Sequence, residues 1–213
     1  MATWLVHIRT AELILEKVPL SRRDFLAGNI AADCGLPDGN GGFDPPKEVT
    51  HWTTSGKGHC NYEDFAQKML PLAHSEQERS FLLGYVSHLI TDCLWVKLIN
   101  NPTKEKFADL YNSDRSEYYR RVKPDWYDND AAYLASHPDC PILSELSQIK
   151  DYDCSIIPYY GRDNVQLQIE HITEFYRTRR YDGREFTYIT PAQIEDFILA
   201  AAEEVLHRLT RFL

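Results

Sequence analysis

Residues 81–95 of the chain read FLLGYVSHLITDCLW, an apolar stretch interrupted by one histidine and one aspartate. Just before it, Ser75 and Glu78 form an S-x-x-E capping box, in which two side chains satisfy free N–H groups at the start of a helix. The capping box and the residues that follow it predict a helix over about residues 76–100. This is the longest helix that the sequence predicts.

Helical spacing and helix boundaries recur along the rest of the chain. Thr190-Pro191-Ala192-Gln193 supplies an N-cap, a proline at the first helical position and a capping-box glutamine. The expected helices span about residues 3–18, 21–33, 61–70, 76–100, 103–121 and 163–180, with another from near Pro124 and a last one from residue 191. No strand pattern of useful length occurs. The sequence therefore predicts an all-α fold, a single-domain multi-helix bundle over residues 1–213.

Residues 34–60 interrupt the helical pattern with six glycines and three prolines. We expect a long loop here, and long loops in compact domains are usually functional or disordered. His51 lies inside this segment.

Composition narrows the class of protein and its location. The formal net charge is −9, and the few arginine pairs are isolated from other basic residues. We therefore do not expect nucleic acid as a partner. The five cysteines are widely spaced and contain no C-x-x-C pair, which is typical of reduced thiols. No secretory signal is visible, and the apolar stretch is broken by His88 and Asp92. We expect a cytoplasmic, soluble protein without a stable membrane anchor.

The histidine and the aspartate of the long helix are the first candidate metal ligands. His88 and Asp92 are four residues apart and therefore project from one helix face. Alone, this pair could also be a core histidine with its hydrogen-bond partner. Their position in a helix rich in leucine, isoleucine and valine favours a bound cation, because buried polar groups are costly unless satisfied.

Three further polar residues could converge on the same point. His7 lies on the first predicted helix at the edge of its apolar stripe, Asp33 lies at the end of the second, and His51 lies on the glycine-rich loop. Histidine nitrogen and carboxylate oxygen suit zinc or a similar divalent ion. Ligands from several separate segments favour more than one ion.

The sequence around these residues resembles the zinc-dependent phospholipase C family, to which the fungal single-strand zinc nucleases are distantly related. The matching motifs are TWLVH at 3–7, GNIAAD at 28–33, THW at 50–52 and LGYVSHLITD at 83–92, in the family's order and spacing. The resemblance is strong over about the first 95 residues. It implies an all-helical fold with a zinc cluster that cleaves phosphodiester bonds.

Carried over by residue, the resemblance implies that Asp33, His51, His88 and Asp92 share one zinc. It also implies that Asp92 bridges to a second ion held by His7. In secreted members an N-terminal tryptophan lends its amine to a metal. Trp4 is internal, so we expect it only to pack.

The family's remaining ion uses two histidines and a glutamate at H-x-x-x-E spacing, which this chain lacks downstream. Replacement ligands are expected among the acids of DWYDND at residues 125–130, and of Asp125, Asp128 and Asp130 we favour Asp128. The alternative is that these acids occupy the first turn of a helix, where the macrodipole favours negative charge.

The expected function is hydrolysis of a phosphate ester at two or more divalent ions, with zinc the ion that the resemblance implies. The substrate would be a small-molecule or lipid-derived phosphate ester. By resemblance, Asp33 would serve as ligand and as proton acceptor for the attacking water. A non-catalytic helical protein that keeps the inner ligands for folding is the alternative, and an open coordination position would separate the two, because structural zinc sites are closed by protein ligands.

Overall fold

The computed structural model describes residues 2–53 and 60–213, which fold almost entirely into helices, so the predicted all-α class is confirmed. The principal elements, in chain order, are α1 (Trp4–Leu15), α2 (Arg22–Ala31), β1 (Leu36–Pro37), β2 (Phe43–Asp44), α3 (Lys47–Thr50), α4 (Tyr62–Met69), α5 (Glu76–Trp95), α6 (Asn101–Lys106), α7 (Ala108–Ser113), α8 (Arg115–Ser136), α9 (Pro141–Gln148), α10 (Asn164–Thr178) and α11 (Pro191–Leu209).

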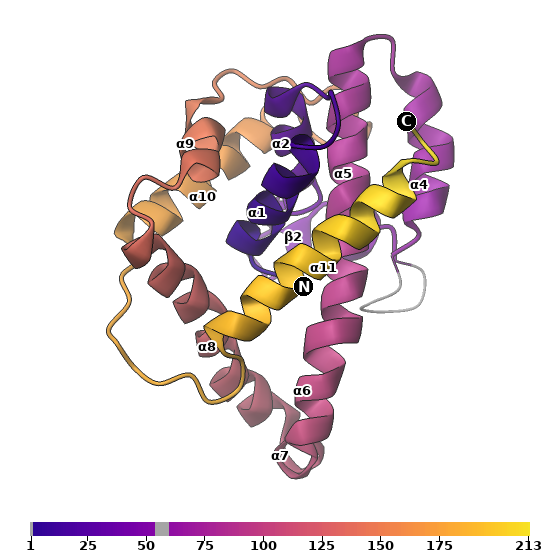
Figure 1. The fold of residues 1–213 in the computed structure, drawn as a ribbon. Helices are drawn as coiled ribbons and strands as arrows, with labels where there is room; N and C mark the ends of the chain where they lie inside the picture. The colour runs from indigo at the N-terminus through magenta and orange to yellow at the C-terminus, as the bar shows by residue number, and fades with distance from the viewer. Residues whose placement is uncertain (1, 54–59) are drawn as a thin grey trace.

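Helix α5 is the central element of the bundle. Its N-cap is Ser75, whose hydroxyl accepts a hydrogen bond from the Glu78 N–H, as the capping box predicts. In Figure 1, α1 and α2 lie to one side of α5 and α4 to the other, while α11 crosses in front. A π-helical turn, Val96–Asn100, joins α5 to α6. The predicted helix over residues 76–100 is therefore continuous, with a change of pitch near its end.

The helical stretch Glu76–Lys106 is long and apolar enough to span a membrane by composition, with a mean hydropathy of 1.3 in its most apolar window. However, 78% of that window is buried inside the protein. This burial is typical of the core helix of a soluble protein.

Two glycines bring α2 and α5 into backbone contact. A Cβ on Gly28 would lie 1.8 Å from the Phe81 carbonyl oxygen, and a Cβ on Gly84 would lie 2.1 Å from the Phe25 carbonyl oxygen. Any side chain at either position would force the helices apart. This close approach sets the end of α2, just before Asp33, beside the face of α5 that carries His88.

The segment predicted as a long loop contains short regular elements among its described residues. Strands β1 and β2 form an antiparallel hairpin in which Leu36 pairs with Asp44. Helix α3 follows, and His51 is its C-cap residue. The loop therefore presents His51 from a helical turn.

Helix boundaries differ from the prediction in the second half of the chain. Helix α8 runs through Pro124, where a new helix was expected, and the expected helix over 103–121 is divided among α6, α7 and the start of α8. Tyr118, Val122 and Trp126 are buried on α8, and their packing outweighs the proline's preference for a helix start. Helix α9 was not predicted at all.

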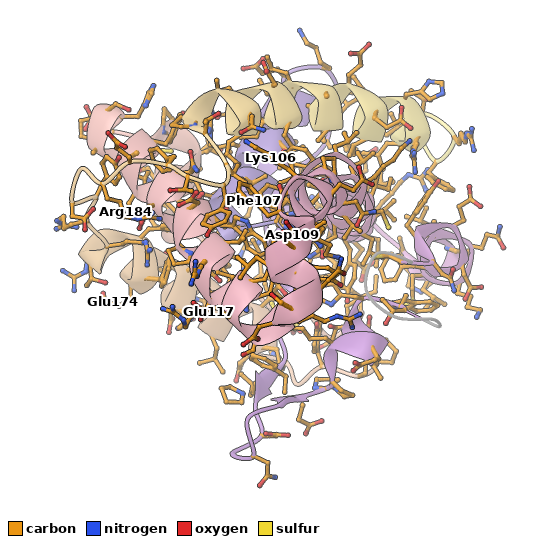
Figure 2. The ribbon with its side chains drawn as sticks, turned by 90° about the horizontal axis from the view of Figure 1, so that it is seen from below. Lys106, Phe107, Asp109, Glu117, Glu174 and Arg184 are labelled. Atoms are coloured by element: carbon orange, nitrogen blue, oxygen red, sulfur yellow. The ribbon has the colours of Figure 1, made fainter. Side chains whose placement is uncertain are left out.

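One hydrophobic cluster contains residues from Ala2 to Leu209. Phe197, Ala201 and Val205 of α11 are buried in it. Figure 2 views the molecule from the α7 end, with Lys106, Phe107 and Asp109 labelled at the junction between α6 and α7. Phe107 packs against Tyr188 with ring centroids 4.7 Å apart, so this junction is tied to the segment that leads into α11.

Candidate metal centre

His88 is completely buried on α5, and its ring is oriented by the backbone of α2. Its Nδ1–H donates to the carbonyl oxygen of Asn29 at 2.7 Å. Burial, together with the neighbouring His7, lowers the pKa of His88 to about 3, so the ring is neutral near pH 7. A neutral ring with its proton on Nδ1 leaves a lone pair on Nε2, which suits that atom for binding a metal.

His51 and Asp33 approach His88 from the other side. The Nδ1 of His51 lies 3.0 Å from the Thr50 hydroxyl, while its Nε2 lies 3.5 Å from Asp33 Oδ1 and 3.5 Å from Asp92 Oδ2. Asp33 directly follows the C-cap of α2. One ligand atom each from Asp33, His51 and His88 lie within 4.8 Å of one another. The structure thus brings together the four residues expected to share one ion.

Three buried atoms at this point have no hydrogen-bond partner among the described residues: His51 Nε2, His88 Nε2 and Asp92 Oδ2. Buried polar atoms are nearly always paired in folded proteins, because leaving them unpaired costs free energy. A divalent cation would satisfy all three together, and two imidazole nitrogens with carboxylate oxygens suit zinc. The residues present therefore fit the metal that the sequence implies.

His7 lies on the opposite side of Asp92. Its Nε2 lies 3.2 Å from Asp92 Oδ1, which also accepts a hydrogen bond from the Ala2 N–H at 2.9 Å. His7, His88 and Asp92 form a second group of ligand atoms within 4.8 Å of one another. The two oxygens of Asp92 therefore face different histidines, an arrangement suited to the predicted bridging role.

The two carboxylates of the centre carry negative charge. Burial alone would raise the pKa of Asp92, but nearby positive charge and the hydrogen bond from His7 hold it well below its usual range. Burial acts in the same direction on Asp33, but Lys47 and the two neighbouring histidines, His88 and His51, together outweigh it, and the pKa falls to about 2. Both groups are ionised near neutral pH and able to bind a cation.

Trp4 and Lys47 complete the surroundings of Asp33. The Trp4 indole N–H donates to Asp33 Oδ2 at 3.0 Å, and the Lys47 ammonium lies 3.3 Å from Asp33 Oδ1. Trp4 therefore positions a ligand and does more than pack, which corrects the expectation from the sequence. Trp4 lies three residues before His7 and so shares its helix face, which could have predicted that Trp4 lies beside the metal centre. Lys47 carried no such signal.

The structure does not support Asp128 as a metal ligand. Its carboxylate pairs with Arg179 at 3.0 Å and with Arg184. Asp125 accepts hydrogen bonds from Arg184 Nη2 at 2.7 Å and from two backbone N–H groups, those of Tyr188 and Ile189. These two acids fasten the segment before α11 onto α8, and neither belongs to a candidate ligand group among the described residues.

Asp130 is also occupied, in a different direction. It accepts hydrogen bonds from the Thr3 hydroxyl and the Tyr176 hydroxyl, both at 2.8 Å. It therefore ties α8 to the start of α1 and to α10. Within residues 2–53 and 60–213, only the two groups that include His88 have metal-ligand spacing, and no third group replaces the missing downstream ligands.

Comparison with known proteins agrees with this centre. The family model described as zinc dependent phospholipase C matches residues 6–95, a range that contains His7, Asp33, His51, His88 and Asp92. No curated protein and no solved structure matches the chain. Over residues 6–95 the chain thus carries the sequence pattern of the zinc dependent phospholipase C family, and the predicted resemblance is confirmed.

Proposed function

We propose that this protein is a metal-dependent hydrolase of phosphate esters, with zinc as the ion that its ligand set favours. The observation that carries the proposal is the convergence of three unpartnered buried atoms, on His51, His88 and Asp92, beside the ionised Asp33. The proposed domain is the whole chain, 1–213, acting as one metal-binding helical unit with two or more ions.

In this proposal each residue of the metal centre has a separate role. When bound, divalent ions of this kind lower the pKa of a bound water and offset charge on a phosphoryl group. Asn29 fixes the His88 ring through its carbonyl oxygen, and His88 belongs to both ligand groups. Asp92 belongs to the group with His7, and its Oδ2 lies 3.5 Å from His51 Nε2 of the other group. Asp33, held by Trp4 through Oδ2, accepts the proton of the attacking water.

The substrate class follows from what the protein offers around this centre. A net charge of −9 argues against nucleic acid, and the most apolar helix is mostly buried, which argues against a membrane anchor. We propose a small-molecule or lipid-derived phosphate ester. A cytoplasmic location is part of the same proposal, supported by five free cysteines.

A metal-stabilised protein without catalysis is the second candidate. Two observations favour it. The side chains of Asp33, His51, His88 and Asp92 are at most 8% exposed. The acids of residues 125–130 make structural contacts instead of offering free ligand atoms. Such deep burial leaves little room for an open coordination position, which catalytic zinc requires.

Metal content and turnover, measured on the same samples, separate the two candidates. Elemental analysis gives equivalents per chain for the wild type, for His88→Ala and for His74→Ala, whose exposed histidine makes it the matched control. Hydrolysis is followed with bis(p-nitrophenyl) phosphate and p-nitrophenyl phosphate. We expect two or more equivalents and turnover in the wild type and in the control, both lost in His88→Ala.

One tightly held equivalent without turnover would favour the metal-stabilised protein. Absence of bound metal from the wild type would refute both candidates.

A further inference from the structure

Cys60 and Cys93 face each other near the metal centre. The Cys60 N–H donates to Cys93 Sγ at 3.4 Å, and Cys93 Sγ lies 4.0 Å from the Cys60 carbonyl oxygen. The two thiol groups also form a hydrogen bond with each other. A small movement of the side chains would therefore bring the sulfur atoms to the S–S bond length of about 2.05 Å.

These two cysteines differ from the other three in exposure and in their partners. Cys60 and Cys93 are half-buried. The other three, Cys34, Cys140 and Cys154, are buried. Cys34 and Cys154 lie near enough to interact electrostatically, but their thiols donate to backbone carbonyl oxygens. Because oxidation of a thiol requires access from solvent, a small oxidant would reach the Cys60–Cys93 pair before the buried cysteines.

The pair joins two segments that carry residues of the metal centre. Cys93 directly follows Asp92 on α5. Cys60 forms an isolated antiparallel bridge with Thr53, which lies two positions after His51. A covalent bond between the two sulfur atoms would therefore fasten the segment that follows His51 to α5, next to Asp92.

We propose that Cys60 and Cys93 are a redox-active pair, which a peroxide oxidises to a disulfide that fastens the His51 segment to α5. One sulfur attacks a peroxide oxygen as its thiolate, which breaks the O–O bond, forms a sulfenic acid and releases one water. The other sulfur then attacks the sulfenic sulfur, which forms the S–S bond and releases a second water. Two thiols thus lose two electrons and two protons, and one hydrogen peroxide becomes two waters.

This site is separate from the proposed hydrolysis and does not depend on it. In a reducing compartment, disulfides are usually transient and redox-sensing, and cellular thiols return them to the reduced state. The pair would therefore be reduced at rest, and the disulfide would form only while peroxide is present.

The test counts thiols and maps the cross-link in the purified full-length chain, with and without a small excess of hydrogen peroxide. Mass spectrometry of the intact protein gives the change in mass, and peptide mapping after alkylation under denaturing conditions identifies the cysteines that are joined. Cys60→Ser and Cys93→Ser each remove one member of the pair. Cys140→Ser is the matched control, because Cys140 is a buried cysteine outside the pair.

We expect peroxide to remove two thiols from wild type and from Cys140→Ser, with a mass loss of about 2 Da and a cross-link between Cys60 and Cys93. Dithiothreitol should restore both thiols. At least one of the two single variants, Cys60→Ser and Cys93→Ser, should keep the attacking thiol, and dimedone should trap its sulfenic acid.

Amide hydrogen exchange measures whether the disulfide fastens the His51 segment. We expect peptides that contain His51 to exchange several-fold more slowly in the oxidised wild type than in the reduced wild type, because the cross-link suppresses local opening. Peroxide should leave this exchange unchanged in Cys60→Ser.

A peroxide-treated wild type that keeps all five thiols, or whose cross-link joins other cysteines, would overturn the proposal. So would equal exchange of the His51 peptides in the oxidised and reduced forms. The peptide map is made on the wild type, so the result does not depend on whether the variants fold. Either outcome would leave the proposed hydrolase function standing, because that function is judged by metal content and turnover.

Discussion

The ring of His7 on α1 lies parallel to the ring of His88 on α5, with centroids 3.8 Å apart and planes inclined by 5°. The His88 ring, neutral near pH 7, adds no charge repulsion to this stack. The stack places two histidines along one carboxylate, since Asp92 Oδ1 contacts His7 while Asp92 Oδ2 lies 3.5 Å from His51 and 3.8 Å from His88. The centre therefore has two groups of ligands, one with His7 and one with His51, and substitutions can remove one group while leaving the other.

We predict that His7→Ala removes one metal equivalent and His88→Ala removes all of them. His7 belongs to one ligand group, whereas His88 and its face of α5 serve both. Metal equivalents after dialysis against a weak chelator, measured beside wild type, check this. Loss of every equivalent from His7→Ala would contradict the bridging role assigned to Asp92.

We predict that Gly84→Ala destabilises the protein by about 1–3 kcal/mol, the usual cost of overpacking a tight contact. The added methyl group would lie 2.1 Å from a backbone oxygen of α2, which cannot move aside as a flexible side chain can. Urea unfolding of metal-free protein gives the free energy of unfolding. Ala200→Leu, at an exposed position of α11, adds more volume with little change in helix propensity and should change that free energy by less than about 0.5 kcal/mol.

We predict that Asp130 makes the folded protein less stable as the pH rises. Burial raises the pKa of Asp130 to about 7, from an ordinary value of 3.8. Below about pH 4 the carboxyl is protonated in both the folded and the unfolded chain, so it contributes no pH dependence. Between about pH 4 and 7 the unfolded chain releases this proton and the folded chain keeps it, so the free energy of unfolding falls.

Asp130→Asn should remove this fall. Metal-free wild type and variant, unfolded in urea at several values between pH 4 and 8, should differ progressively more as the pH increases. A difference that stays constant across that range would show that Asp130 ionises normally in the folded chain.

Local sequence signals predict the part of the site on α5, His88 and Asp92, but they do not predict how Asp33 and His51 join it. The capping box at Ser75 and the spacing of His88 and Asp92 predict one helix with two ligands on one face, because both patterns act within a few turns. The convergence of Asp33 and His51 depends on how α2 packs on α5 and on the short helix α3. Spacing alone does not contain that information, and the family resemblance supplied it.

The arginine partners of Asp128, which compete with the predicted role as a metal ligand, could not be read from local sequence. A carboxylate on a helix is equally suited to a metal and to an arginine, and Arg184 lies 56 positions further along the chain, in a segment without regular structure. Lys47 was missed for a related reason. A lysine in a glycine-rich loop resembles any solvated charge until the loop folds beside Asp33.

The start of α1 is held by partners from distant parts of the chain. The Ala2 N–H bonds to Asp92, the Thr3 hydroxyl to Asp130 and the Leu5 N–H to the Tyr176 hydroxyl, across separations of 90, 127 and 171 residues. During synthesis the first helix therefore leaves the ribosome before any of its three anchors exists. Contacts of such long range slow folding, because the chain between them must first be brought together. His7 thus takes its place beside Asp92 late, and the start of α1 is fully anchored only after α10 has been made.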